Sequence, residues 1–79
     1  MKVQQAVALR LSDLMVKNNL SQYEIAKRMC TDKNTIKHIL KQEYKSIKFD
    51  TVIKIAQALN MPLLEFLDDK VFDYENLDL

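Results

Sequence analysis

Residues 20–42 read LSQYEIAKRMCTDKNTIKHILKQ, and this segment carries the strongest helix signals in the chain. Ser21 is a favoured helix N-cap, and Glu24 three residues later completes the sequence pattern of a capping box, so a short helix is expected after Ser21. Asp32 is a favoured cap for a next helix, because its carboxylate accepts a hydrogen bond from a backbone N–H one turn in. The stretch therefore predicts two short helices joined by a tight turn, the second over residues 33–41.

The second of these helices has one apolar and one polar face. At 100° per residue the apolar arc holds Ile36, Ile39 and Leu40, which predicts that they are core residues. The opposite arc holds Lys33, Asn34, Lys37, His38 and Lys41. A helix fits the major groove of B-DNA, where lysine donates to guanine, asparagine pairs with adenine, and histidine donates or accepts. The pattern predicts a helix-turn-helix motif whose base-reading residues are Lys33, Asn34, Lys37 and His38.

Phosphate contacts are expected around the same helix. Residues 27–48 hold seven basic and two acidic side chains, a local balance of +5. The basic side chains supply positive charge, and Gln22, at the start of its helix, supplies N–H donors. The predicted phosphate-binding residues are Gln22, Lys27, Arg28, Lys41, Lys45 and Lys48. The alternative interpretation of the regular lysine spacing is a solvated helix face that binds nothing.

Helical periodicity predicts three further helices. The first covers residues 3–17, and its inward positions are Val3, Val7, Leu11, Leu14 and Met15. Another has Asp50 as its expected N-cap and an apolar stripe of Phe49, Val52, Ile53, Ala56 and Leu59. The last begins around Pro62 and runs through Leu67. Because glycine is absent and proline occurs once, the composition also favours an all-α fold of five helices over strands and turns.

The composition excludes several classes of protein. Without glycine, neither a phosphate-binding loop nor a dinucleotide-binding fingerprint is possible. Cys30 and His38 are the only residues of their kinds, so we expect no disulfide within the chain, no zinc site and no cofactor. No pair of catalytic groups is presented together, so an enzyme is not expected. We expect Cys30 to be a small buried residue in a reducing, cytoplasmic protein, with no membrane-spanning segment.

Charge divides the chain into two parts. Residues 1–59 have a balance of +6, and residues 60–79 a balance of −5. We expect a DNA-binding domain over residues 1–68 and an acidic C-terminal tail over residues 69–79, with an anionic partner for the first and a separate role for the second. Apolar residues near the end predict a homodimer interface at Leu63, Leu64, Phe66, Leu67 and Phe72.

Two segments resemble the Cro/repressor (XRE-type) helix-turn-helix family. Residues 20–42 share Leu20, Ser21, Gln22, Glu24, Ile25, Ala26, Thr35 and Ile36 with it, and FDTVIKIAQALNMPLLEFL at residues 49–67 is similar to its fourth and fifth helices. The resemblance implies a five-helix, lambda-repressor-like domain that binds operator DNA, usually as a dimer. It places base contacts at Lys33, Asn34, Lys37 and His38, and phosphate contacts at Gln22, Lys41 and the loop after the recognition helix.

The chain departs from the family pattern at two kinds of position. Cys30 and Gln42 stand where the family often has glycine, in a left-handed conformation that costs a residue with a Cβ roughly 1 kcal/mol. Met15 and Leu40 stand where many members have an arginine–glutamate ion pair. Packed apolar residues can replace a buried ion pair without loss of stability, so we expect Met15 and Leu40 to touch.

These observations predict a sequence-specific double-stranded DNA-binding transcriptional regulator, in particular a repressor. The alternative is an antitoxin, in which the same domain binds operator DNA and the acidic tail grips a protein toxin. A helical interaction module that has lost DNA binding is a further alternative, against which stand the basic recognition face and the basic loop.

Overall fold

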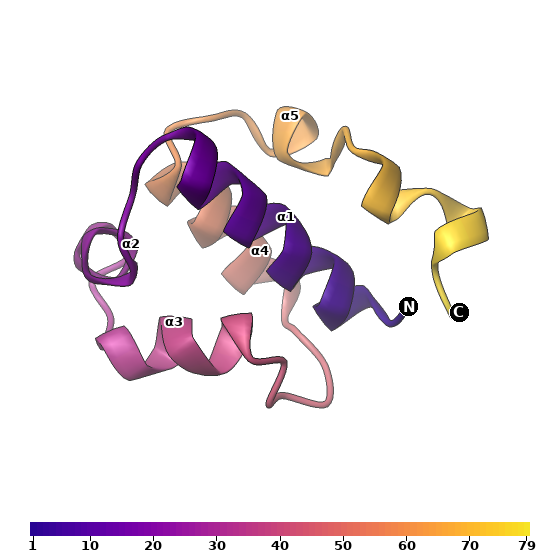
Figure 1. Cartoon of the computed structure of the whole chain (residues 1–79), viewed down its shortest axis with the longest axis horizontal. Helices are drawn as coiled ribbons and strands as arrows, with labels where there is room; N and C mark the ends of the chain where they lie inside the picture. The colour runs from indigo at the N-terminus through magenta and orange to yellow at the C-terminus, as the bar shows by residue number, and fades with distance from the viewer.

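The computed structural model describes all residues from 1 to 79 and is entirely helical (Figure 1). Its helices are α1 (Val3–Lys17), α2 (Gln22–Arg28), α3 (Lys33–Leu40), α4 (Phe49–Ala58) and α5 (Leu63–Leu67). Two single 3-10 turns follow, η1 (Lys70–Phe72) and η2 (Tyr74–Asn76). The all-α fold of five helices predicted from the sequence is confirmed. None of the helices combines the length and the hydropathy needed to cross a lipid bilayer.

Four helices end in the same backbone motif although the chain has no glycine. The residue after each C-cap lies in the left-handed region, with φ of 53° at Asn19, 54° at Cys30, 61° at Gln42 and 58° at Asn60. In each case the next backbone N–H donates to the carbonyl five residues earlier, as in Leu20 to Met15 at 2.9 Å. This is the Schellman arrangement, for which glycine is the usual choice. Asparagine tolerates the conformation, whereas Cys30 and Gln42 hold it at a cost.

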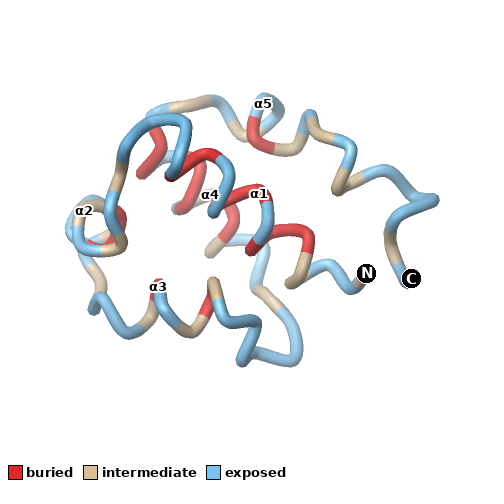
Figure 2. Tube along the Cα trace, in the orientation of Figure 1, coloured by how far each residue is buried: buried red, intermediate tan, exposed pale blue.

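A single core joins all five helices. Its largest fully buried side chains are Phe66, Leu11, Ile25, Ile36, Ile55 and Val7. Figure 2 shows the buried positions on the inward sides of α1, α3 and α4, while the outer side of α3 and the loop after it are exposed. This arrangement fixes α3 from behind and leaves its opposite side open to solvent.

The fourth helix differs in detail from the expected one. Lys48 is its N-cap, and Asp50 lies in the first turn instead of capping it. Phe49 is 64% exposed and does not belong to the apolar stripe, while Ile55 is fully buried. The helix begins two residues earlier than an Asp50 cap would require, because Lys48 is extended and its carbonyl accepts from Thr51 and Val52. The predictions for Asp50 and Phe49 were therefore wrong.

The expectation of a buried Cys30 is also wrong, because the residue is exposed. Cys30 occupies the left-handed position of the turn after α2, with φ of 54°. The backbone N–H of the next residue, Thr31, closes this turn by donating to the carbonyl of Ala26 at 2.9 Å.

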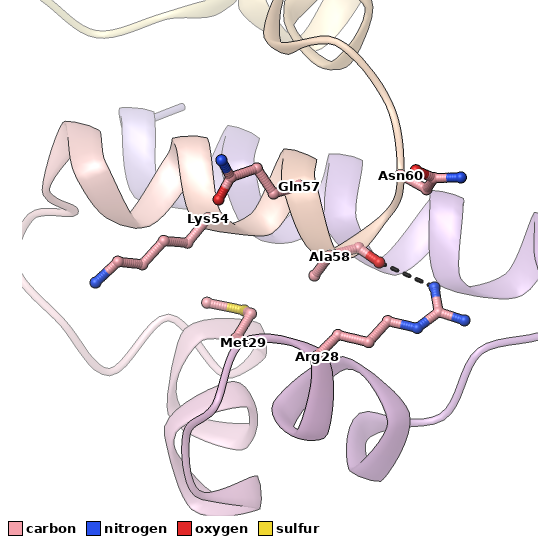
Figure 3. A pocket seen from close by; sticks show the side chains of 6 residues that line it. All are labelled: Arg28, Met29, Lys54, Gln57, Ala58 and Asn60. Carbon is pink, nitrogen blue, oxygen red and sulfur yellow. Dashed lines mark hydrogen bonds between the residues drawn. The ribbon is translucent and has the colours of Figure 1, made fainter.

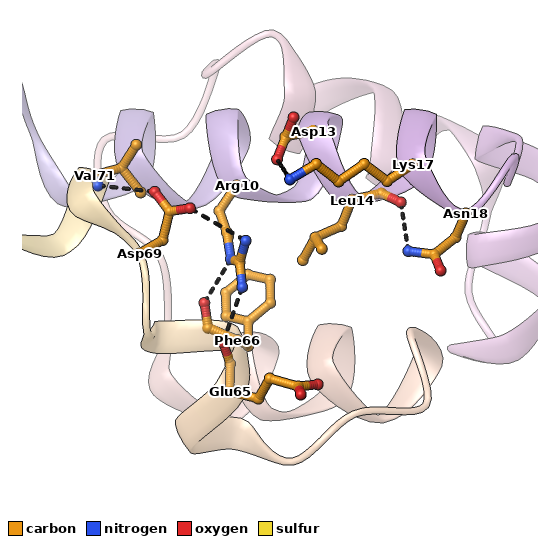
Figure 4. A network of polar contacts seen from close by, with 9 residues as sticks. All are labelled: Arg10, Asp13, Leu14, Lys17, Asn18, Glu65, Phe66, Asp69 and Val71. Carbon is orange, nitrogen blue, oxygen red and sulfur yellow. Dashed lines mark hydrogen bonds and ion pairs between the residues drawn. The ribbon is translucent and has the colours of Figure 1, made fainter.

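The acidic C-terminal tail, residues 69–79, folds back onto α1 (Figure 4). Arg10 is buried, and its guanidinium donates to the carbonyls of Phe66 and Glu65 and to the Asp69 carboxylate. At the far end the Met1 amino group donates to the Asn76 carbonyl at 2.7 Å. Residues 69–78 therefore continue the packing of the preceding domain, and Figure 1 shows the two ends of the chain side by side.

Candidate nucleic-acid interface

Local hydrogen bonds set the start of both helices of the motif. The Ser21 Oγ accepts from the Glu24 backbone N–H at 3.1 Å, so Ser21 caps α2 as predicted. The Asp32 carboxylate accepts from the Asn34 backbone N–H at 2.7 Å, so Asp32 caps α3. Both acceptors satisfy backbone donors that the first turn of a helix leaves without partners. The turn between the helices is fixed at one end by the Asp32 cap and at the other by the bond from the Thr31 N–H to the Ala26 carbonyl at 2.9 Å.

The polar face of α3 is open along its length. Ile36 and Ile39 are buried beneath it, and Leu40 is half-buried against the core, as the helical pattern predicted. The outward side chains that are exposed and make no hydrogen bond or ion pair within the chain are Lys33, Asn34, Lys37 and Lys41. Their donors are free to meet another molecule.

His38 differs from these neighbours. Its ring is partly exposed, and Nδ1 is paired with the Glu43 carboxylate in the loop after α3. Tyr44 meets the ring edge-on, with centroids 6.2 Å apart and planes at 71°. His38 is thus held in place from the loop side. Neither residue is predicted from the sequence to contact His38: Tyr44 is expected there either to touch the sugar-phosphate backbone or to pack, and Glu43 has no predicted role. Their spacing of five and six residues from His38, just past a helix end, is the signal that could have found them.

The predicted phosphate-binding residues surround α3 unevenly. Lys27, Lys45 and Lys48 are exposed and unpaired, and Gln22 is half-buried at the first position of α2. Arg28 has a structural partner instead. It lies beside a hollow between α2 and α4, where one guanidinium nitrogen donates to the Ala58 carbonyl at 2.9 Å (Figure 3).

The residues predicted at a dimer interface separate into three groups. Leu64 is 80% exposed. Leu63, Leu67 and Phe72 are half-buried against the core. Phe66 is 0% exposed, because the bundle absorbs its ring next to Arg10 and Phe72. A buried ring has nothing to offer a partner, so the assignment of Phe66 to an interface is corrected.

The comparison with known families agrees with this architecture. The model of a helix-turn-helix family matches residues 11–66, which spans α2, α3 and α4, the C-terminal half of α1 and most of α5. The chain belongs to the helix-turn-helix family of the Cro/repressor (XRE) type, as its sequence resemblance implied. No curated protein and no solved structure matches the chain.

Membership of this family, together with the exposed polar face of α3, defines the class of protein. The chain is a DNA-binding transcription regulator. The base-reading and phosphate-binding roles of its residues remain predictions.

Proposed function

We propose that this protein is a repressor that binds operator DNA as a homodimer, with α3 of each protomer in the major groove. The observation that carries the proposal is the row of free donors on α3, at Lys33, Asn34 and Lys37, above a buried apolar face. Asn34 is suited to adenine and the lysines to guanine. His38 completes the proposed set of base readers.

Phosphate contacts supply most of the affinity in this proposal. Lys41, Lys45 and Lys48 form an exposed basic strip from the end of α3 to the start of α4, and Lys27 and Gln22 add donors from α2. Such contacts position a protein on the duplex without reading its sequence. Arg28 is left out of this set because the Ala58 carbonyl already holds it.

The test is the salt dependence of binding to a duplex selected from a random pool. If a dimer neutralises about four to eight phosphates, the logarithm of the binding constant falls against the logarithm of salt concentration with a slope of roughly −4 to −7. Fluorescence anisotropy on labelled DNA measures the slope. A flat response, or no binding at low salt, overturns the proposal.

A dimer is proposed because one recognition helix reads only a few base pairs. Two-fold dimers place their recognition helices roughly 34 Å apart, one turn of DNA. Leu64 supports an interface at α5, since it is 80% exposed and Leu63 and Leu67 flank it on the same short helix. The net negative charge of residues 60–79 also keeps this end away from DNA.

The antitoxin alternative rests on the acidic C-terminal segment. Tyr74 is 85% exposed between Asp73 and Glu75, and aromatic groups with neighbouring carboxylates suit a basic protein partner. Asp69 is less available, because Arg10 holds it. Stoichiometric co-purification of a small basic protein with the native chain, lost on Tyr74→Ala, would favour the antitoxin. Isolation of the chain alone favours the repressor.

A further inference from the structure

The end of α3 brings a carboxylate onto the recognition helix. Gln42 is left-handed, and the backbone N–H of Glu43 donates to the carbonyl of His38 at 3.1 Å. The same two residues are joined a second time, by a hydrogen bond between the imidazole Nδ1 and the Glu43 carboxylate. A backbone bond and a side-chain bond between one pair of residues hold the ring in a defined orientation.

This pair stands where a Schellman motif usually has an apolar contact. The equivalent pairs at the other three helix ends are Leu20 with Met15, Thr31 with Ala26, and Met61 with Ala56. None of those contains a charged group. Only at the end of the proposed recognition helix does the position hold a titratable pair.

Glu43 is also unfavourable for a surface that binds phosphates. It is one of two acidic residues between positions 27 and 48, and the other, Asp32, caps α3. An exposed carboxylate beside a DNA backbone weakens binding to every sequence by repulsion. Its presence is explained if it orients His38 and thereby determines which base His38 recognises.

The bond between His38 Nδ1 and Glu43 determines whether the other ring nitrogen, Nε2, accepts or donates a hydrogen bond. An ionised carboxylate only accepts hydrogen bonds, so the proton of a neutral His38 sits on Nδ1. Nε2 makes no hydrogen bond within the chain and is then a pure acceptor. When the ring is protonated, Nε2 becomes a donor while Nδ1 keeps its bond to Glu43.

We propose that Glu43 is a positioning residue that makes His38 a proton-dependent base reader: neutral His38 accepts from adenine N6 or cytosine N4, and protonated His38 donates to guanine O6 or N7. The proposal rests on the proposed function, because it needs α3 in the major groove. It goes beyond that function, since it makes the preferred base at one operator position change with pH. Histidine is the side chain whose charge changes between pH 5 and 8.

The surroundings of His38 leave Glu43 as its only charged partner. Tyr44 faces the ring edge from the loop. Its basic neighbours in sequence are Lys37 on α3 and Lys41, the C-cap of that helix, and both are exposed and unpaired. No charged side chain of α1, α2 or α4 forms an ion pair or hydrogen bond with the imidazole.

The first test is the tautomer of His38 in the free protein, read from its ring nitrogen resonances in a long-range proton–nitrogen spectrum. The chain has one histidine, so the signals need no further assignment. At pH 8 the native protein should carry its proton on Nδ1. Glu43→Gln keeps the shape but can donate as well as accept, so it should shift the proton substantially to Nε2. An Nε2-protonated ring in the native protein overturns the proposal.

The second test is selection of bound duplexes from a random pool at pH 5.5 and pH 8. For the native protein, one operator position should change from guanine to adenine or cytosine between the two, with each preference roughly five- to a hundredfold. Glu43→Gln should weaken the preference for adenine or cytosine at pH 8. His38→Gln should abolish the pH dependence of the base preference. Asp50→Asn, which removes an exposed carboxylate of α4, is the matched control for charge and should leave the change intact.

The possible outcomes separate the two proposals. No binding of the native protein at low salt overturns the proposed function and with it the base-reading role of His38, whatever the tautomer. Binding with one unchanged preference at both pH values overturns the role of Glu43 and His38 alone. A preference that changes equally in native protein and Glu43→Gln shows that Glu43 does not control the ring, and overturns the proposal too.

Discussion

Arg10 on α1 donates from Nε to the backbone carbonyl of Phe66 on α5 at 2.8 Å, across 56 residues of sequence. Its Nη2 donates to the Glu65 carbonyl at 2.9 Å, and its Nη1 pairs with Asp69 at 3.2 Å. The last carbonyls of a helix have no partners within the helix. Arg10 therefore caps α5 from another part of the chain and joins the acidic segment to the bundle.

Arg10→Ala should lower the free energy of unfolding by about 3 kcal/mol, because it leaves the buried Phe66 carbonyl without a donor and Asp69 without its counter-charge. Urea denaturation followed by circular dichroism measures the change. Lys17→Ala is the control, since it removes an exposed i,i+4 pair with Asp13, and it should cost well under about 1 kcal/mol. Equal losses for the two variants would contradict a capping role for Arg10.

Glycine at the left-handed positions should stabilise the protein. Cys30→Gly and Gln42→Gly each relieve a Cβ conflict, partly offset by the greater freedom of glycine in the unfolded chain, for a net gain of about 0.5–1 kcal/mol each. Asn60→Gly should gain less, because asparagine already tolerates φ near the 58° observed there. Thermal unfolding of the three variants ranks their stabilities. If Cys30→Gly and Gln42→Gly both destabilise the protein, the left-handed backbone at Cys30 and Gln42 is not strained.

Met15 and Leu40 should be energetically coupled. Met15 is buried, Leu40 is half-buried against the same core, and both line one hollow beside α2. Neither points into solvent, which agrees with packed residues in place of an ion pair. A double-mutant cycle with Met15→Ala and Leu40→Ala should give a coupling energy of about 0.5–1 kcal/mol. Strict additivity would show that the two side chains do not pack together.

The proposed dimer depends on Leu64. Leu64→Asp should leave the fold intact, because the side chain is exposed in the monomer, and should shift the protein to monomer in sedimentation at micromolar concentration. Val16→Asp places the same charge at a comparably exposed apolar residue of α1 and should leave a dimer undisturbed. Removing everything after Pro62 is a poorer test, since Phe66 and the partners of Arg10 would be lost with it. A dimer that survives Leu64→Asp places the interface elsewhere.

Much of the fold could be predicted from the sequence because local signals decide it. Ser21 and Asp32 cap their helices through bonds to residues two or three positions away. Asn19 and Asn60 end α1 and α4 because asparagine accepts positive φ at low cost. Such signals lie within a few residues, so no knowledge of tertiary contacts is needed to use them.

The misplacement of Phe66 arose because distant parts of the chain decide the structure around it. The sequence does not show that Arg10 meets carbonyls 55 and 56 residues away, although a lone arginine between Val7 and Leu14 on a largely apolar helix is a weak signal. That contact fixes α5 against α1 and helps to bury Phe66, which the sequence analysis had assigned to a dimer interface. The pairing of His38 with Glu43 was missed for a local reason. It depends on a left-handed backbone at Gln42, a position where the family often has glycine.

The role of α3 as recognition helix is tested by comparing Asn34→Ala with Lys45→Ala on a panel of duplexes that vary each base of the selected operator. Asn34→Ala should weaken binding to the preferred site by about 1–3 kcal/mol and relax the preference at one base position. Lys45→Ala should weaken all duplexes alike and reduce the magnitude of the salt slope by about 1 per protomer, leaving the preference unchanged. Unchanged affinity and preference in Asn34→Ala would contradict the assignment of α3 as the recognition helix.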